Sequence, residues 1–439
     1  MNILLIGSGG REHAIANALA RGPRLRQLFV APGNPGIARR GELVDLDVAD
    51  HRAVAEFCRQ NGVGLVVVGP EQPLIAGIAD DLAAQNILVF GPTRAAARLE
   101  GSKGFTKDLC RAHHIPTADY GRFDNEAAAL VFAREKGAPH RAPEGRPSQG
   151  TGYVVVKADG LAAGKGVVVA QDLDEAERAI RAMFAGSFGR SGSEVVIEEF
   201  LQGEEVSFFA LCDGERALSF GTAQDHKRVG EGDTGPNTGG MGAYSPASAL
   251  TPAMEALVLE TIVEPTLRAM REMGAPYRGV LYAGLMLTAE GPKLIEYNAR
   301  LGDPEAQVIL PRLEDDLLEL MLAAARGALP ERAPRFSKRA ALTVVLAAKN
   351  YPAAPIVGTQ IRELERAEAA ENVIVTHAGT KLVEGKLLAA GGRVLNVTAL
   401  ADTVVEAQAR AYAAVDLIDW PGGFCRRDIG WREVARERA

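Results

Sequence analysis

VVVKADGLAAGKGVVVA, residues 154–170, sets two β-branched runs on either side of a glycine-rich loop. The runs predict two strands, and ADGLAAGKG between them predicts a hairpin-like connection. Such a loop can fold its backbone N–H groups over a polyphosphate while lysines supply positive charge. The residues concerned are Gly160, Gly164, Gly166, Lys157 and Lys165. It is not a Walker A loop, because Gly166 rather than Ser or Thr follows the Gly-Lys pair. Taken alone, the pattern is equally typical of a plain turn with surface lysines.

A second stretch, KLIEYNARLGDPE at residues 293–305, interleaves polar and apolar side chains. Alternate side chains of an extended strand share a face, so Glu296, Asn298 and Arg300 are expected to point the same way. A carboxylate and an amide oxygen suit Mg²⁺ that bridges phosphates, and a guanidinium suits a carboxylate or a phosphate. The apolar neighbours favour a buried strand. We therefore expect a functional cluster rather than the polar face of an edge strand.

A third stretch, VVIEEFLQGEEVSF at residues 195–208, carries consecutive acids that interrupt a strand pattern. Glu198 and Glu199 could present backbone groups to a base, and Glu205 could offer a carboxylate to a ribose. The spacing alone does not establish these roles.

The N-terminus begins with a short apolar run that leads into GSGGREHA at residues 7–14. The order predicts a strand, a glycine turn and a helix, and free N–H groups at a helix start favour an anion. A phosphate or carboxylate is therefore expected near Gly9, Gly10 and Arg11. A nicotinamide dinucleotide is not expected, because its G-x-G-x-x-G fingerprint needs a glycine where Glu12 stands. The acid that would hold its ribose after the second strand is also missing.

The bulk composition is that of an ordinary soluble globular protein. The 439 residues are 47% hydrophobic and 24% charged, with a formal net charge of −7, which argues against nucleic acid as the main partner. Four cysteines without a C-x-x-C pair predict reduced thiols in a reducing compartment. No apolar stretch reaches the ~18 residues of a membrane span. We expect a cytoplasmic protein that binds neither nucleic acid nor membrane.

Length and pattern together predict an α/β chain of about three domains. Residues 1–100 alternate strand-like and helix-like runs, the βαβ signature of a parallel, Rossmann-like sheet. Glu71 follows one of these strands, where ligands of open α/β sheets collect. A last segment from about residue 335 has strands and a helix for a small third domain.

Two stretches predict loops. Residues 138–152 contain three prolines and three glycines with little apolar content, which predicts a surface excursion. Asp225–Ser245 is rich in glycine and has too little apolar content for a core element. A loop of that length in a compact domain is usually functional or disordered.

The order of these patterns resembles the ATP-grasp ligases, with a glycine hairpin, an E-E-x-L-x(3)-E connector and a final E-x-N-x-R strand. Within that superfamily the chain resembles the phosphoribosylamine–glycine ligases, also called glycinamide ribonucleotide synthetases. QDHKRVGEGDTGPNTGGMGAYSP together with RLGDPE is highly specific to that family. The matching stretches run from residue 7 to 432 and include GGREHA, VAPGNPG, GPEQPL, LEGSKGFTKD, KADGLAAGKGV, IEEFLQGEE, LYAGLM, HAGTK and FCRRDIGWR.

The resemblance implies an N-terminal domain at 1–100, an ATP-grasp domain at 101–334 with a nucleotide-covering subdomain at about 120–195, and a small α+β domain at 335–439. It implies that glycine is joined to 5-phosphoribosylamine at the expense of ATP, through a glycyl phosphate. The products are glycinamide ribonucleotide, ADP and phosphate, in de novo purine biosynthesis. Mg²⁺ or Mn²⁺ would assist. We expect a monomer, and a monofunctional enzyme, since the resemblance ends with the chain.

The site residues are carried over motif by motif. ATP would be held by Lys103, Lys157, Gly160, Gly164, Lys165, Gly166, Glu198, Glu199, Leu201 and Glu205, with Glu198, Glu199 and Leu201 at the adenine and Glu205 at the ribose. The metal ion would be held by Glu296 and Asn298. The phosphoribosyl substrate would be held by Gly9, Gly10, Arg11, Glu71, Asp225, Lys227 and Arg228. The catalytic set would be Arg300, which faces the reacting carboxylate, with Lys157 and Asp303. His13 and His226 are expected to be orienting or structural residues.

Two features depart from the pattern. Many ATP-grasp enzymes carry a further acidic metal ligand 12 or 13 residues before the Glu of E-x-N, where this chain has Gly284 and Ala283. A second tightly held metal ion is therefore in doubt. The 138–152 excursion is longer than the family usually has.

Two other functions remain as alternatives. One is another ATP-grasp enzyme that acts on a phosphoribosyl compound of purine synthesis, against which the DHKR loop argues. The other is a catalytically silent nucleotide-binding protein, against which the intact Lys157, Glu296, Asn298 and Arg300 argue.

Overall fold

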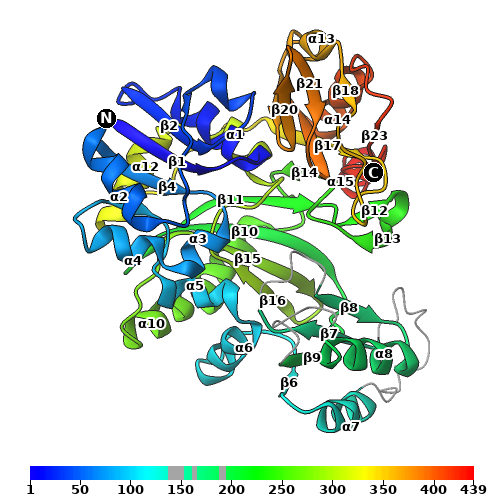
Figure 1. Ribbon diagram of the computed structural model, residues 1–439. Helices are drawn as coiled ribbons and strands as arrows, with labels where there is room; N and C mark the ends of the chain where they lie inside the picture. The colour runs from blue at the N-terminus through cyan, green and yellow to red at the C-terminus, as the bar shows by residue number, and fades with distance from the viewer. Residues whose placement is uncertain (137–152, 161–165, 187–193) are drawn as a thin grey trace.

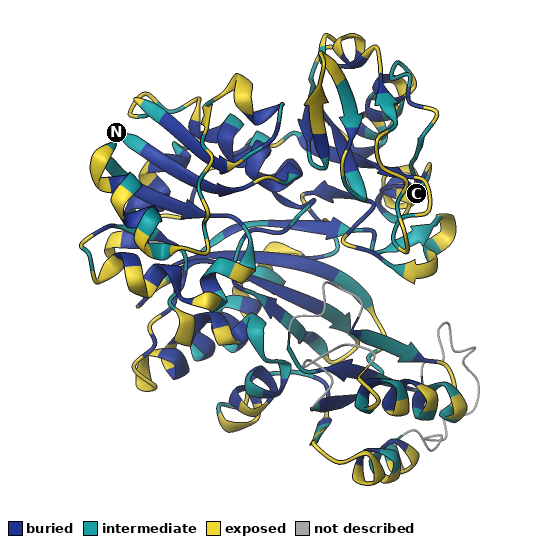
Figure 2. Ribbon diagram, in the orientation of Figure 1, coloured by how far each residue is buried: buried dark blue, intermediate teal, exposed yellow. Residues whose placement is uncertain are grey.

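The computed structural model describes residues 1–136, 153–160, 166–186 and 194–439. Figure 1 shows an N-terminal lobe in blue, a C-terminal lobe in orange and red, and a smaller lobe around β7 and β9, grouped about a long central sheet. In Figure 2 the strands of these sheets are mostly buried, and the helices expose their outer faces. No helix of the described part of the chain is long and apolar enough to span a membrane.

The N-terminal lobe is built on a parallel five-stranded sheet of order β3-β2-β1-β4-β5. Residues 3–6 are completely buried, which explains why this strand reads as an unbroken apolar run. The predicted βαβ pattern is confirmed. The elements are β1 (Asn2–Gly7), α1 (Gly10–Leu19), β2 (Gln27–Pro32), η1 (Ile37–Arg39), β3 (Glu42–Leu43), α2 (His51–Gln60), β4 (Val63–Val68), α3 (Glu71–Ala76), α4 (Ile78–Ala83) and β5 (Val89–Phe90).

The central sheet has nine strands in the described part of the chain. Its order is β16-β15-β10-β11-β14-β17-β22-β19, and β23 pairs with β17. The elements up to residue 326 are α5 (Arg94–Gly101), α6 (Lys103–Ala112), β10 (Glu204–Asp213), β11 (Ala217–Asp225), β12 (Arg228–Gly230), η3 (Glu231–Asp233), β13 (Thr234–Asn237), β14 (Gly242–Ser245), α9 (Pro252–Val258), η4 (Leu259–Val263), α10 (Glu264–Glu272), β15 (Arg278–Thr288), β16 (Gly291–Asn298), α11 (Ala306–Ile309), η5 (Leu310–Arg312) and α12 (Leu317–Arg326).

The smaller lobe carries the two strands of the predicted glycine hairpin. Its sheet has the order β6-β9-β7-β8, and the register Val154↔Ala170 confirms the two predicted strands as a hairpin. The hairpin tip at 161–165 and the predicted excursion at 138–152 lie outside the described residues. The elements are β6 (Tyr120–Phe123), α7 (Glu126–Lys136), β7 (Val154–Ala158), β8 (Val167–Ala170), α8 (Leu173–Phe184) and β9 (Val195–Glu199).

Four C-terminal strands, β17, β19, β22 and β23, continue the central sheet, because β17 pairs with β14. Three others form a separate sheet of order β18-β21-β20. The domain boundaries at residues 100 and 334 stay predictions. The elements are β17 (Ala340–Ala348), β18 (Gln360–Ile361), α13 (Leu364–Glu368), β19 (Val373–His377), β20 (Thr380–Val383), β21 (Lys386–Ala389), β22 (Arg393–Ala401), α14 (Val404–Val415), β23 (Gly423–Phe424) and α15 (Trp431–Arg438).

The prediction that all of Asp225–Ser245 lies outside the core is wrong at its C-terminal end. β14 pairs with both β11 and β17, and the side chains of Met241, Ala243 and Tyr244 are completely buried. The Tyr244 hydroxyl donates a hydrogen bond to the side chain of Gln224. Four residues are too few to show an apolar pattern, and the strand is buried by neighbours from distant parts of the sequence.

Candidate active site

A cleft of about 1210 Å³ is lined by residues from all three lobes. Most of the predicted site residues line it, namely Arg11, Glu71, Lys103, Lys157, Gly160, Gly166, Glu198, Glu199, Leu201, Glu205, Asp225, Lys227, Arg228, Glu296, Asn298, Arg300 and Asp303. Gly164 and Lys165 lie outside the described residues. Gly9 and Gly10 do not line the cleft.

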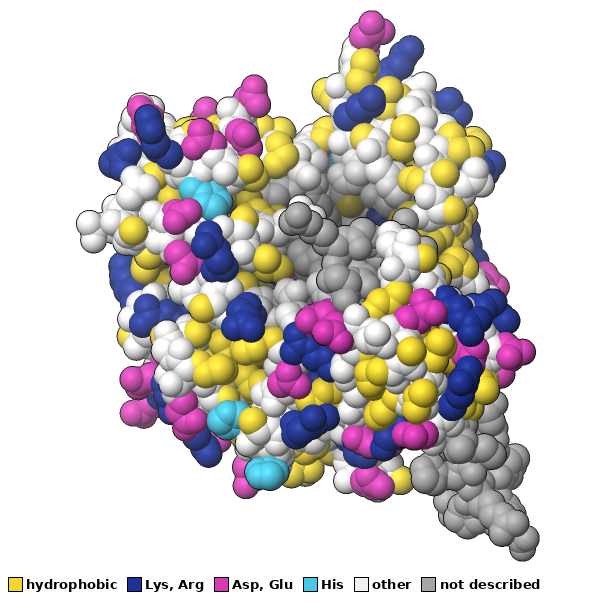
Figure 3. Space-filling model, turned by 60° about the horizontal axis from the view of Figure 1, so that its bottom comes forward, with side chains coloured by type: hydrophobic (Ala, Val, Ile, Leu, Met, Phe, Trp, Pro, Cys, Tyr) yellow, Lys and Arg dark blue, Asp and Glu magenta, His cyan; other side chains and the backbone are white. Residues whose placement is uncertain are grey.

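The outer surface and the cleft both carry charges of the two signs. Figure 3 shows basic and acidic side chains interspersed over the face that it presents. Inside the cleft, three lysines and Arg300 act together on the half-buried carboxylate of Glu296. Basic side chains therefore lie around Glu296, among acidic side chains that also line the cleft.

Glu296 and Asn298 reach the cleft from the end of β16, two residues apart, as predicted for one face of a strand. Arg300 lies beyond the end of the strand, in the bend that follows it. Burial acts to raise the pKa of Glu296, but Lys227, Lys157, Lys103 and Arg300 outweigh it and hold that pKa below its ordinary value. The carboxylate is therefore ionised and available to a cation.

This pair of oxygen donors fits a hard divalent ion that is completed by phosphate oxygens. Gly284 lies directly opposite Glu296 in the β15–β16 register, so the neighbouring strand offers no second carboxylate there. Within the described ranges, no group of three or more His, Cys, Asp or Glu side chains could hold a metal ion.

Two predicted phosphate-binding lysines are held by contacts inside the cleft wall. Lys157 Nζ lies 2.7 Å from Glu198 Oε1, and both side chains are about 4% exposed. Lys103 Nζ donates a 2.9 Å hydrogen bond to the carbonyl of Gly160, at the start of the glycine loop. Burial lowers the pKa of Lys103 below its ordinary value despite the nearby Glu296. Sequence reasoning missed Lys107, which pairs with the other oxygen of Glu198 at 2.9 Å.

Arg300 is fixed by two carboxylates from the N-terminal side of the cleft. Its Nε lies 3.2 Å from Glu71 Oε2, and its Nη2 lies 3.0 Å from Glu100 Oε1. Burial acts to lower the pKa of Arg300, but Glu100 and Glu71 outweigh it and raise that pKa. Glu100 was missed, although it lies in the quoted LEGSKGFTKD motif. It also accepts the backbone N–H of Ala299 at 2.7 Å.

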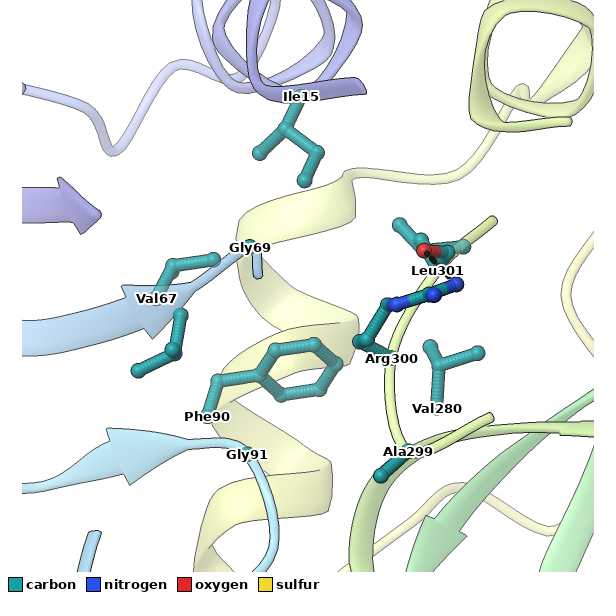
Figure 4. A pocket seen from close by; sticks show the side chains of 10 residues that line it. Ile15, Val67, Gly69, Phe90, Gly91, Val280, Ala299, Arg300 and Leu301 are labelled. Carbon is teal, nitrogen blue, oxygen red and sulfur yellow. Dashed lines mark hydrogen bonds between the residues drawn. The ribbon is translucent and has the colours of Figure 1, made fainter. Parts of the chain in front are cut away.

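A small cavity of about 10 Å³ lies against the Arg300 segment, at the contact with the N-terminal lobe. Figure 4 shows Phe90 and Val67 from that lobe on one side, and Arg300 and Val280 on the other. Ile15 approaches from α1. Apolar packing therefore sets the backbone of this segment, and ion pairs set the guanidinium.

Asp303 lies beside the glycine turn of the N-terminal lobe. It accepts a 2.7 Å hydrogen bond from Gln307 and lies 3.3 Å from Arg393 Nη2. Burial acts to raise the pKa of Asp303, but Arg393 and Arg11 outweigh it and hold that pKa low. A Cβ on Gly10 would come within 2.3 Å of Asn396 Nδ2, so this glycine is needed for packing.

A second acidic group lies at the end of β11. Burial raises the pKa of Asp225 to about 8; Lys227 opposes this rise, and Glu305 and Glu205 reinforce it. Glu305 accepts a 2.9 Å hydrogen bond from the Tyr282 hydroxyl. Tyr282 and Glu305 also line the cleft and were missed, although they lie in the quoted LYAGLM and RLGDPE motifs.

The two histidines have structural contacts, as expected. His13 Nδ1 accepts the backbone N–H of His377 at 2.8 Å, and His226 Nε2 accepts the backbone N–H of Gly430 at 2.8 Å. Burial lowers the pKa of His13 to about 3 and also lowers the pKa of His226. Both rings are therefore neutral acceptors near pH 7.

The chain is similar to known proteins along its whole length. The family models for phosphoribosylglycinamide synthetase match with the N domain at 1–100, the ATP-grasp (A) domain at 101–306 and the C domain at 341–432. A phosphoribosylamine–glycine ligase of Mesorhizobium japonicum is 61% identical over 439 residues, all of both chains. The crystal structure of phosphoribosylamine–glycine ligase from Thermotoga maritima superposes with a TM-score of 0.83 at 32% identity, over 98% of this chain and 100% of that one.

A more distant likeness concerns the fold alone. The biotin carboxylase domain of Hydrogenobacter thermophilus 2-oxoglutarate carboxylase, solved with MgADP, has a TM-score of 0.70 at 16% identity. The match covers 96% of this chain and 91% of that one. On the family models and the full-length identities, the chain belongs to the phosphoribosylglycinamide synthetase family.

Proposed function

We propose that this chain is an ATP-dependent ligase that joins glycine to 5-phosphoribosylamine and releases glycinamide ribonucleotide, ADP and phosphate, in de novo purine biosynthesis. The observation that carries the proposal is the cleft, where lysines, an oxygen-donor pair and a fixed arginine from separate lobes meet. The family membership and the name of the full-length relatives support it.

The chemistry needs no side-chain nucleophile. A carboxylate oxygen of glycine attacks the γ-phosphorus of ATP, the bond to ADP breaks, and a glycyl phosphate forms. The amine of 5-phosphoribosylamine then attacks the glycyl carbonyl carbon, a C–N bond forms, phosphate leaves and the nitrogen loses a proton. Catalysis of this kind consists mainly of positioning and charge stabilisation.

The nucleotide would lie between the smaller lobe and the central sheet. We assign its phosphates to Lys103 and Lys157 with the glycine loop, and its adenosine part to the segment after β9. The full set is Lys103, Lys157, Gly160, Gly164, Lys165, Gly166, Glu198, Glu199, Leu201 and Glu205. Glu198 is paired with two lysines, so we expect its backbone rather than its carboxylate to contact the adenine.

Glu296 and Asn298 would hold a divalent ion, for which we propose Mg²⁺ with Mn²⁺ as the alternative. When bound, the ion neutralises charge on the phosphates. The low pKa of Glu296 keeps its carboxylate charged for this purpose over the whole neutral range.

The acceptor end of the cleft would hold the two small substrates. We assign Arg300 to the carboxylate of glycine, because Glu71 and Glu100 fix its guanidinium. The phosphoribosyl part would lie near Arg11, Glu71, Asp225, Lys227 and Arg228, with Gly9, Gly10 and Asp303 behind them. We further propose that the chain is a cytoplasmic monomer with domain boundaries at residues 100 and 334. Light scattering on the purified chain tests whether it is a monomer.

The reaction is tested by ADP release from Mg-ATP and glycine, with and without 5-phosphoribosylamine generated in situ from ribose 5-phosphate and ammonia. We expect ADP and a product of the mass of glycinamide ribonucleotide only when all components are present. Binding of ATP without turnover would favour a silent nucleotide-binding protein. Turnover with a different acid or acceptor would retain the ligase and reject the substrates.

A further inference from the structure

Three charged side chains form a buried triad in the wall of the cleft. Lys107 Nζ lies 2.9 Å from Glu198 Oε2, and Lys157 Nζ lies 2.7 Å from Glu198 Oε1. All three side chains are 3–4% exposed. Burying three charges is costly unless the geometry is well satisfied. The single carboxylate is therefore shared between two ammonium groups, one for each oxygen.

The triad is also tied to the strand that carries the metal-binding pair. Lys107 Nζ donates a 2.7 Å hydrogen bond to Thr117 Oγ1, whose hydroxyl donates to the carbonyl of Leu294 at 2.6 Å. Lys157 Nζ donates to the carbonyl of Ile295 at 3.3 Å. Leu294 and Ile295 directly precede Glu296 in β16. Contacts of the triad thus connect α6, β7 and β9 to the backbone beside Glu296 and Asn298.

We propose that Lys107 is a positioning residue, which acts through Glu198 to fix the Lys157 ammonium next to the strand of Glu296. The inference rests on the proposed function, in which Lys157 contacts the phosphates. Within the described contacts, the Lys157 ammonium donates one hydrogen bond, to the Ile295 carbonyl, and lies in an ion pair with Glu198 Oε1. An ammonium has three N–H donors, so donor capacity is left for a phosphate oxygen. Without Lys107, both oxygens of Glu198 turn to Lys157 and draw its ammonium away from the strand of Glu296.

The test is Lys107→Met in the wild-type chain and in the Lys157→Met chain. We expect the single-turnover rate of ADP formation to fall about 10²-fold in the wild-type background, the scale of a 1 Å misplacement. In the Lys157→Met background, Lys107→Met should alter the rate less than about twofold. The ammonium through which Lys107 acts is already absent there. The affinity for Mg-ADP, measured by calorimetry, should change less than about threefold in either background.

Lys293→Met is the matched control, because Lys293 lies on the same strand β16 and pairs only with Glu290 among the described contacts. It should leave the rate unchanged. The proposal is overturned if Lys107→Met lowers the rate equally in both backgrounds, or lowers it in neither.

Thr117→Val keeps the experiment decisive if Lys107→Met does not fold. Thr117→Val preserves the shape of the side chain but removes one hydrogen-bond acceptor of Lys107 and the link to Leu294. We expect a smaller loss of rate than for Lys107→Met, and we expect that loss to depend on Lys157 in the same way. Failure of the proposed function is distinct. A wild-type chain that forms ADP with another acid rejects glycine as the substrate, yet the triad is still tested by ADP formation.

Discussion

Glu296 is the residue on which the metal assignment depends. Replacing it with glutamine keeps the shape but removes the charge that four cations surround. We expect Glu296→Gln to lower kcat for ADP formation about 10²–10³-fold, the usual loss when one preorganised electrostatic contact is removed. Raised Mg²⁺ should restore part of the rate. Glu290→Gln is the control, since Glu290 is exposed in the same hairpin; an equal loss there would contradict the assignment.

Gly10 gives a second test for a single residue, because its role in packing differs from the anion-binding role that the sequence suggested. A Cβ there would lie 2.3 Å from Asn396 and 2.6 Å from Gln307, and both side chains are about 1% exposed. Gly10→Ala should lower the free energy of unfolding by about 1–3 kcal/mol through overpacking. The thermal midpoint measures this effect.

Gly284→Ala is the matched control for that change. Gly284 is also buried, but a Cβ there meets its nearest neighbours at 3.5 Å, an ordinary contact. An unchanged midpoint for Gly284→Ala with a lowered one for Gly10→Ala would support a packing role. A Gly10→Ala chain of normal stability that loses turnover would instead indicate a direct contact with substrate.

At the scale of elements, the contact between α1 and β19 predicts a pH dependence of stability. Burial lowers the pKa of His13 to about 3 and that of His377 to about 4. From pH 6.5 down to about 4 these two histidines bind protons in the unfolded chain but not in the folded chain, so their contribution to stability falls as the pH falls. Two groups contribute at most about 2.7 kcal/mol per pH unit near pH 5.

Thermal midpoints between pH 7 and pH 5 check this slope. His377→Asn should flatten it, because one of the two proton-binding differences is removed. His114→Asn is the control, since His114 is exposed and should leave the slope as it is. A slope unaffected by His377→Asn would show that other groups cause the acid sensitivity.

The elements also show what the sequence could and could not predict. β1, β7, β8 and β16 were predictable because each carries a period or an apolar run of its own. β14 was not, because its burial is supplied by β11 and β17 from other parts of the chain. The same limit applies to side chains: Lys107 and Glu100 became visible only when the fold placed them against Glu198 and Arg300.

At the scale of the whole molecule, the C-terminal segment supports the stretch that carries Asp225, Lys227 and Arg228. Arg426 is 1% exposed and lies 2.9 Å from Asp233 and 2.7 Å from Asp428. It also donates a 3.0 Å hydrogen bond to the carbonyl of Arg228. A residue of the C-terminal segment thus holds the stretch to which we assign the phosphoribosyl substrate.

Arg426→Met should therefore impair substrate binding at one end of the cleft and leave nucleotide binding at the other end unchanged. We expect KM for 5-phosphoribosylamine to rise about tenfold or more while the Kd for Mg-ADP changes less than about twofold, because the nucleotide residues belong to other elements. Asp428 loses its ion-pair partner, whereas Asp233 keeps Arg432 at 2.6 Å. Breaking a buried pair costs about 3–5 kcal/mol, so the assay must be run well below the thermal midpoint. Arg427→Met is the matched control, since this neighbour forms an exposed pair with Asp416. If Mg-ADP affinity fell in step with the rise in KM, Arg426 would support the whole fold rather than the acceptor end alone.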